Sequence, residues 1–304
     1  MYIRKAIVAG QFYPSRKEEL VKLIETCFKD STFGPGDLPK IGNKKEVIGA
    51  VLPHAGYVYS GPAAASAVYD IVESYSSNLS LVIIGPNHTG LGSEIAIVKE
   101  GYFETPLGKV EVDKELAEFL LENYINLEED LTAHENEHSI EVQLPFFQYF
   151  YGNNFKIVPI ILRHTSFREE VSLELGYTLR DMIKEFEDKK NIVVIASSDF
   201  THYGILYGYT PIFGSYQKVR KFVEERDMEV IEYIKKLDLM NFFKYIEEEN
   251  LTICGYGPIG VLIGLAKALD YKITVELKKY YTSSDIAGIS QNFVAYASIV
   301  FKRK

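Results

Sequence analysis

Three apolar segments, each followed closely by a histidine, constrain the fold of this chain more than any other feature. The segments are residues 47–52, 79–84 and 192–196, and the histidines that follow them are His54, His88 and His202. Apolar runs of this length are typical of strands buried on both faces of a parallel sheet. Ligands and catalytic groups of such sheets gather beyond the carboxyl ends of the strands. If the three strands share one sheet, three imidazoles meet at one edge of it.

The order of the expected elements predicts an α/β fold, with a central mixed, largely parallel sheet in a three-layer α/β/α arrangement. A helix at 62–75, with Pro62 in its first turn, joins the strands at 47–52 and 79–84, and this βαβ unit implies parallel strands. The other expected helices are 17–29, 113–122, 139–150, 168–187, 215–235, 239–248 and 258–269. The other expected strands are 95–98, 109–112, 156–162, 191–196, 271–280 and 293–301. The last two alternate in polarity, as edge or antiparallel strands do.

Composition excludes several classes of function. The formal charge is −9, and the basic residues are scattered apart from the tail at 302–304, so no nucleic-acid partner is expected. The N-terminal residues lack the apolar core that a signal peptide needs, so none is expected, and no apolar stretch reaches the roughly 20 residues that span a bilayer. We expect a cytoplasmic protein without a membrane partner. Because no linker or repeat divides the chain, residues 1–304 are expected to form a single domain.

The cysteines differ in their surroundings. Cys27 and Cys254 are the two cysteines of the chain, so a disulfide framework is not expected. Cys27 lies on the apolar side of the helix at 17–29 and is interpreted as buried packing. Cys254 lies among glycines before the helix at 258–269, where the helix dipole is expected to lower its pKa and favour the thiolate. Its alternative role is that of a small buried apolar side chain.

His54, His88 and Cys254 together form a candidate metal-ligand set. Two imidazoles and a thiolate suit zinc, copper or iron(II), and three protein ligands leave coordination positions open, as in catalytic sites. Asp199 and His202 would stand nearby as a further ligand, an orienting group or an acid/base. Each histidine could instead bond to a carbonyl at a strand end. Without a metal, Cys254 and a histidine could act as a nucleophile and its base.

A second polar cluster occupies residues 135–141. If Ser139 begins a helix, Glu137 and Glu141 are four residues apart and His138 and Glu141 three apart, so these groups could share a face. The cluster could support a metal site or cap a helix, and both interpretations stay open. His134 and His164 have no comparable context and are expected at the surface.

Six motifs, in their order and spacing, resemble those of the Memo family, which is named for mediator of ErbB2-driven cell motility. They are residues 5–14, 53–57, 85–88, 137–141, 198–204 and 252–255. The resemblance that rests on them covers nearly the whole chain. The resemblance implies a fold similar to that of class III extradiol dioxygenases, the LigB-like enzymes, with a metal pocket at the strand ends.

The resemblance also implies roles for individual residues. The metal ligands of the family fall on His54, His88 and Cys254, while Asp199 and His202 line the pocket. His202 matches the position where the dioxygenases keep a catalytic acid/base histidine. Cys254 departs from those enzymes, which place a carboxylate there to complete a 2-His-1-carboxylate triad. A thiolate is softer and more oxidisable, so the fold does not imply ring cleavage.

For function, the resemblance implies copper or iron binding and redox activity. Animal members are linked to phosphotyrosine-containing peptides, and microbial relatives are grouped with a radical-SAM protein. Our leading hypothesis is a metal-dependent oxidoreductase of unknown substrate that uses iron(II) or copper in preference to zinc, with His202 and Asp199 as catalytic residues. The alternative is a non-enzymatic protein whose crevice binds a peptide or small ligand through Tyr57, Tyr203 and the histidines. A third hypothesis is thiol nucleophile catalysis by Cys254.

Overall fold

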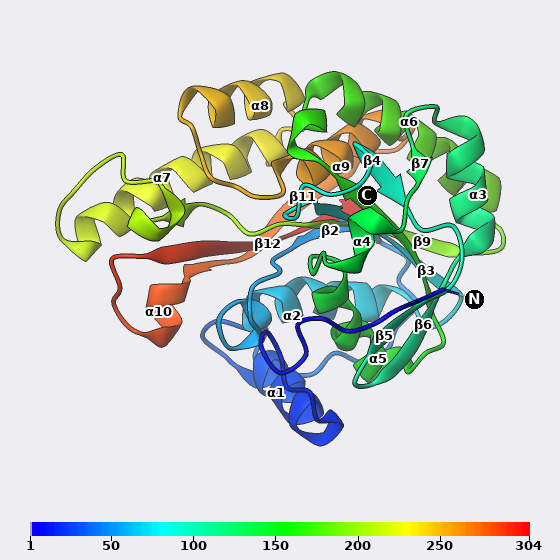
Figure 1. The fold of residues 1–304 in the computed structure, drawn as a ribbon, viewed down its shortest axis with the longest axis horizontal. Coiled ribbons are helices and arrows are strands. Elements are labelled where there is room, and N and C mark those ends of the chain that lie inside the picture. The colour runs from blue at the N-terminus through cyan, green and yellow to red at the C-terminus, as the bar shows by residue number, and fades with distance from the viewer. Residues whose placement is uncertain (1) are drawn as a thin grey trace.

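The computed structural model describes residues 2–304, and in that part of the chain twelve strands form a sheet between two groups of helices (Figure 1). The path runs β1-β5-β6-β8-β3-β9-β2-β12-β10, while β11 pairs with β12, and β4 pairs with β7 and β8. The strands are β1 (Ile3–Arg4), β2 (Val47–Leu52), β3 (Leu79–Pro86), β4 (Ile95–Ile97), β5 (Tyr102–Thr105), β6 (Gly108–Val112), β7 (Glu128–Glu129), β8 (Lys156–Leu162), β9 (Asn191–Ser197), β10 (His202–Tyr203), β11 (Ile273–Thr282) and β12 (Phe293–Arg303). The predicted α/β class with a mixed, mostly parallel sheet is confirmed.

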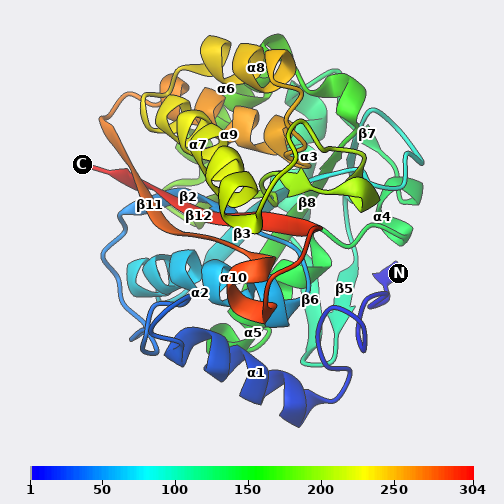
Figure 2. The same ribbon diagram turned by 90° about the vertical axis from the view of Figure 1, so that its left-hand side faces the viewer.

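The helices cover both faces of this sheet (Figure 2). They are α1 (Lys17–Lys29), α2 (Tyr57–Ser74), α3 (Lys114–Asn123), α4 (Thr132–Glu135), α5 (Leu144–Tyr151), α6 (Glu169–Phe186), α7 (Tyr216–Lys235), α8 (Leu239–Glu248), α9 (Tyr256–Ala268) and α10 (Ser283–Ala287). Helices α1, α2 and α5 share one apolar core with the sheet, and α3 and α6 to α9 share the other. Within residues 2–304, no helix combines the length and the apolar character that a membrane crossing needs.

The central strands are apolar at nearly every position because each contributes to both cores. In β3, Leu81 and Ile83 belong to the core of α1, α2 and α5, while Val82 and Ile84 belong to the core on the opposite face. Side chains of a strand alternate between faces, so a strand covered on both sides needs apolar residues throughout. Strand β9 lies between β3 and β2 and is parallel to both. The carboxyl ends of these three strands therefore meet at one edge.

Three of the predicted elements differ from the structure. Helix α2 begins at Tyr57 and not at Pro62, so Pro62 lies inside it and omits one backbone hydrogen bond. The helix expected at 139–150 is a 3-10 turn, η1 (Glu141–Gln143), followed by α5, which carries a proline in its first turn. Strand β12 is antiparallel, as expected, but it lies between β2 and β11 and is not an edge strand.

A buried ion pair ties the N-terminal segment to the rest of the molecule. The guanidinium of Arg4 contacts the carboxylate of Glu141, and both side chains are almost fully buried. Glu141 also accepts hydrogen bonds from the backbone N–H of Ile7 (2.9 Å), the N–H of Val8 (3.2 Å) and the hydroxyl of Tyr13. One carboxylate thus fixes a loop that has no regular secondary structure of its own.

We expect Glu141→Gln to lower the free energy of unfolding by about 3–5 kcal/mol, because it leaves the Arg4 charge buried without a counter-charge. The matched control is Glu25→Gln, which removes a carboxylate from an exposed pair with Lys29 and should leave stability unchanged. Denaturant unfolding followed by circular dichroism measures both. Equal stability of the two variants would show that the buried pair does not hold the N-terminal segment.

Candidate metal centre

The structure brings His54, His88 and Cys254 together. One nitrogen of each imidazole and the Cys254 sulfur lie within 4.8 Å of one another. His54 follows β2, His88 follows β3, and Cys254 precedes α9, so three distant segments supply the cluster. His54 Nε2 lies 3.2 Å from Cys254 Sγ. This juxtaposition requires β2 and β3 to end at the same edge of the sheet, as they do.

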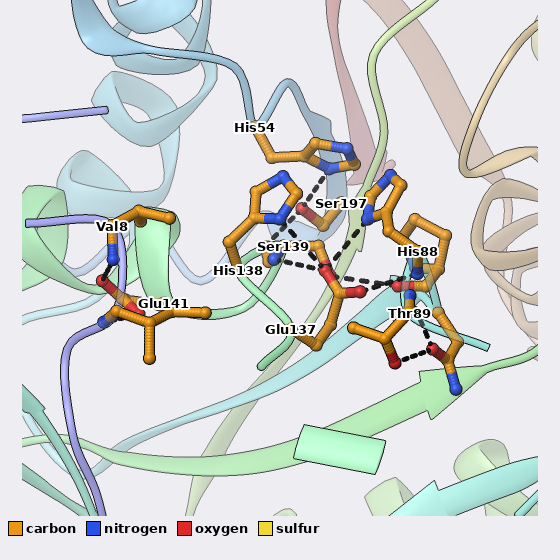
Figure 3. A network of polar contacts seen from close by, with 12 residues as sticks. Val8, His54, His88, Thr89, Glu137, His138, Ser139, Glu141 and Ser197 are labelled. Carbon is orange, nitrogen blue, oxygen red and sulfur yellow. Dashed lines mark hydrogen bonds and ion pairs between the residues drawn. The ribbon is translucent and has the colours of Figure 1, made fainter. Parts of the chain in front are cut away.

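Hydrogen bonds fix the tautomer of His54. The hydroxyl of Ser197 donates to the Ser139 carbonyl (2.6 Å), so it accepts from His54 Nδ1 (3.0 Å) (Figure 3). Its other lone pair accepts from Gln143 Nε2 (2.9 Å). The His54 proton therefore sits on Nδ1, and Nε2 presents a lone pair towards Cys254. Burial lowers the pKa of His54 well below its ordinary value, so the ring is neutral.

Glu137 fixes His88 in the same manner. Its carboxylate accepts from the backbone N–H of His88 (2.7 Å), from His88 Nδ1 (3.0 Å) and from the N–H of Ser139 (2.9 Å) (Figure 3). Burial favours the neutral ring of His88, but the Cys254 thiol and the Glu137 carboxylate together raise its pKa to about 10. Burial also acts against the charge of Glu137, yet the bond to His88 and the nearby imidazoles lower its pKa to about 2. Nε2 of His88 is again the atom left for a ligand.

Cys254 is placed by the backbone that follows it. The N–H of Gly255 donates to the Ser198 hydroxyl (3.0 Å), and a Cβ at Gly255 would lie 2.5 Å from the Ser197 carbonyl oxygen. Only glycine allows this approach to the end of β9. The expectation of a lowered thiol pKa is wrong for the protein without metal, because burial raises the pKa of Cys254. Desolvation outweighs the helix dipole here.

Asp199 and His202 lie beside this cluster. Asp199 Oδ1 accepts the backbone N–H of His54 (2.9 Å), and burial raises the pKa of Asp199. His202 Nδ1 donates to the Thr252 carbonyl (3.0 Å), while the backbone N–H of His202 donates to the Thr252 hydroxyl (2.9 Å). Ligand atoms of Asp199, His202 and Cys254 also fall within 4.8 Å of one another. Thr252, which the sequence did not single out, thus orients His202.

His138 is a further imidazole of this cluster. Its ring stacks on His88 with centroids 4.8 Å apart and meets His54 edge-on at 5.5 Å. Burial lowers the pKa of His138 to about 4, so this ring is neutral. The shared face expected for Glu137 and Glu141 is wrong, because no helix includes residues 137–140. Glu137 bonds to the candidate ligand His88, whereas Glu141 bonds to the N-terminal segment.

Two expectations about the other histidines had different outcomes. His164 is exposed, as expected. His134 is buried, contrary to the expectation of a surface position, because it lies on α4 with its ring edge-on to Phe103. Its Nε2 lies 3.3 Å from the Ala96 carbonyl oxygen, and the residue takes no part in the cluster.

A cavity of about 790 Å³ opens beside the cluster. Five of the polar side chains described above line it: His54, His88, His138, Asp199 and His202. The contacts expected from Tyr57 and Tyr203 are wrong, because both side chains are buried and their hydroxyls donate to the carbonyls of Val142 and Ile212. Tyr59 and Tyr207 line the cavity instead. The size of the cavity suits a small-molecule ligand.

Comparison with known proteins identifies the family. The sequence model of the Memo-like protein family matches residues 4–300. The chain belongs to the Memo family. It is 44% identical over 305 residues to a MEMO1 family protein of Pyrobaculum aerophilum, with all of both chains covered. It is 42% identical over 301 residues to one of Methanopyrus kandleri, with 99% of each chain covered.

A solved structure shows the same fold. An uncharacterized protein from Escherichia coli K12 superposes with a TM-score of 0.52 at 15% identity, over 83% of this chain and 98% of that one. In this Memo family member, His54, His88 and Cys254 offer two imidazole nitrogens and one sulfur beside an open cavity. The donor set therefore fits a transition metal, with room for a further ligand on the cavity side.

We expect Glu137→Gln to weaken metal affinity by about 10–100-fold, because the amide loses the charge that supports His88 and can also donate to Nδ1. Ser197→Ala, which removes the uncharged partner of His54, should weaken it less. Titration of each variant with Co(II) gives the dissociation constants. An unchanged affinity in Glu137→Gln, or a larger loss in Ser197→Ala, would contradict the role assigned to the carboxylate.

Proposed function

We propose that this protein is a metal-dependent redox protein that holds iron(II) or copper through His54, His88 and Cys254 and acts on a substrate in the adjoining cavity. The observation that carries the proposal is the preset orientation of both imidazoles. Each ring uses Nδ1 in a hydrogen bond to Ser197 or Glu137, which leaves Nε2 of each ring for a metal. Nε2 of His54 offers a lone pair already, and Nε2 of His88 offers one once its proton is lost. Such orientation of histidines by outer partners is typical of metal sites.

We favour iron or copper over zinc because the cluster has an open side towards the cavity. A thiolate and two imidazoles bind all three metals, but a cavity that admits a substrate and oxygen suits a metal with accessible redox states. When bound, such a metal would supply electron transfer to or from the substrate.

The two polar side chains beside the candidate ligands, His202 and Asp199, have different roles in this proposal. His202 lines the cavity, and its Nε2 is free to hold or move a proton because Nδ1 is bonded to the Thr252 carbonyl. Asp199 fixes the backbone of His54 through its Oδ1 and so keeps one candidate ligand in place. His202 is therefore our candidate proton carrier and Asp199 a positioning residue.

Thiol nucleophile catalysis is a second candidate, favoured by one distance. His54 Nε2 lies 3.2 Å from Cys254 Sγ, which is within reach for a base. However, burial raises the pKa of Cys254, so the protein without metal holds the less reactive thiol. The metal-binding proposal needs no thiolate before the metal arrives.

Elemental analysis of anaerobically purified protein tests the proposal. We expect about one iron or copper per chain in the parent and its loss in Cys254→Ser, because the alcohol is a poor ligand for these metals. The matched control is Cys27→Ala, which removes the other thiol from the buried face of α1 and should keep the metal. Parent protein without metal would refute the proposal. Rapid alkylation of Cys254 in that protein would then support thiol catalysis.

Metal binding should release about two protons near neutral pH. His88, with a pKa of about 10, and the Cys254 thiol, whose pKa is raised, both carry protons that a metal must displace. His54 is already neutral and contributes none. Apparent affinity should therefore rise with pH until these pKa values are passed. Calorimetric titrations in buffers of different ionisation enthalpy measure the proton count, and a count of zero would contradict the assigned protonation states.

A further inference from the structure

The side chains that line the cavity away from the metal cluster are mostly uncharged, and metal binding alone does not require this. Within residues 2–304, no lysine or arginine side chain lines the cavity. Its walls away from the metal cluster are aromatic, aliphatic or uncharged polar, and the aromatic ones are Phe12, Tyr59, Tyr207 and Tyr296. Away from the histidine cluster, a carboxylate or phosphate would find no cationic side chain on these walls to pair with, and burying such an unpaired charge is costly.

The rim of the cavity is also apolar. Leu206 is 79% exposed and Ile289 is 70% exposed, and Ile205 beside Leu206 is similarly exposed. Ile289 lines the cavity itself. The backbone N–H of Leu206 donates to Asn292 Oδ1 (2.9 Å), and Asn292 also lines the cavity, so η3 (Ile205–Tyr207) adjoins the wall. The exposed apolar side chains thus continue the cavity outwards.

The sequence around the rim is uncharged over long stretches. Residues 200–217 and 286–301 contain no aspartate, glutamate, lysine or arginine, although charged residues make up 25% of the chain. These are the segments that carry η3, Ile289 and much of the cavity wall. These two segments therefore bring no aspartate, glutamate, lysine or arginine to the cavity wall.

We propose that the cavity takes an uncharged, largely apolar molecule whose polar end lies at the histidine cluster and whose apolar body extends along the rim of Tyr59, Tyr207 and Ile289. This inference rests on the proposed function, since it takes the cavity beside the metal ligands as the place of the substrate. The Cys254 thiolate would offset one of the two positive charges of a divalent ion. The cavity volume of about 790 Å³ holds a molecule larger than a single ring.

Displacement of the uncharged dye Nile red tests this inference. The competitors are naphthalene methanol and naphthoate, which share an aromatic body and differ in charge. We expect saturable dye binding, and displacement by naphthoate should need a concentration at least about tenfold higher than that for naphthalene methanol. Absence of saturable binding, or equal displacement by the two competitors, would overturn the proposal.

Rim variants locate the binding. Ile289→Lys and Leu206→Lys should weaken binding of naphthalene methanol by about fivefold and reduce its advantage over naphthoate, because each adds a cation at the rim. Ile125→Lys is the matched control, since Ile125 is 95% exposed and lies outside the cavity lining. Equal behaviour of the rim variants and this control would show that the dye binds elsewhere.

The same titrations on metal-free and metal-loaded protein separate the two proposals. Metal bound without any preference for the uncharged competitor would overturn the substrate class and leave the metal function standing. A preference for naphthalene methanol in a protein that binds no metal would overturn the metal function, while the proposal of an uncharged, apolar ligand would stand.

Discussion

The parallel pairing of β3 and β2 with β9 is the constraint on which the rest of the site depends. Neighbouring strands in a sheet are about 4.8 Å apart, so residues that follow parallel strands at the same edge are held close together. His54 and His88 are 34 positions apart in the printed sequence, yet their ring centroids are 5.1 Å apart. The apolar composition of these strands is required by the two cores that cover them. The apolar composition that buries these strands in the sheet therefore also brings the imidazoles together.

The sheet brings the imidazoles together, but hydrogen bonds decide which nitrogen of each ring faces the cluster. Ser197, Glu137 and the Thr252 carbonyl each accept from the Nδ1 atom of one histidine. These acceptors come from the end of β9, from the segment before η1 and from the loop before Cys254. Without these acceptors, either nitrogen of each ring could face the cluster. Orientation by fixed acceptors removes that freedom before any metal binds.

Much of the fold and of the ligand cluster follows from the sequence, because long periodic segments and strand-end motifs carry strong signals. The helix α1 and the strands β2 and β8 lie where expected, and His54, His88 and Cys254 come together as expected. Short strands such as β1 and β10 were not predicted, because two residues carry no periodicity and only their partners define them.

The wrong prediction of where α2 begins also led to the wrong tyrosine being predicted at the cavity wall. Because the helix begins at Tyr57, that side chain points into the core, and Tyr59 takes the place at the cavity wall. The raised pKa of Cys254 was missed because burial is a property of the folded chain. His138 was left open because its role depends on the ring of His88, which approaches it only after folding.

The central claim is that Cys254 and two imidazoles form one metal site. X-ray absorption spectroscopy on metal-loaded protein tests it most directly, because the spectrum counts sulfur and imidazole neighbours of the bound ion. The account predicts one sulfur and two imidazole nitrogens around the bound ion. A spectrum of the parent with only oxygen and nitrogen neighbours, or with no imidazole, would contradict it.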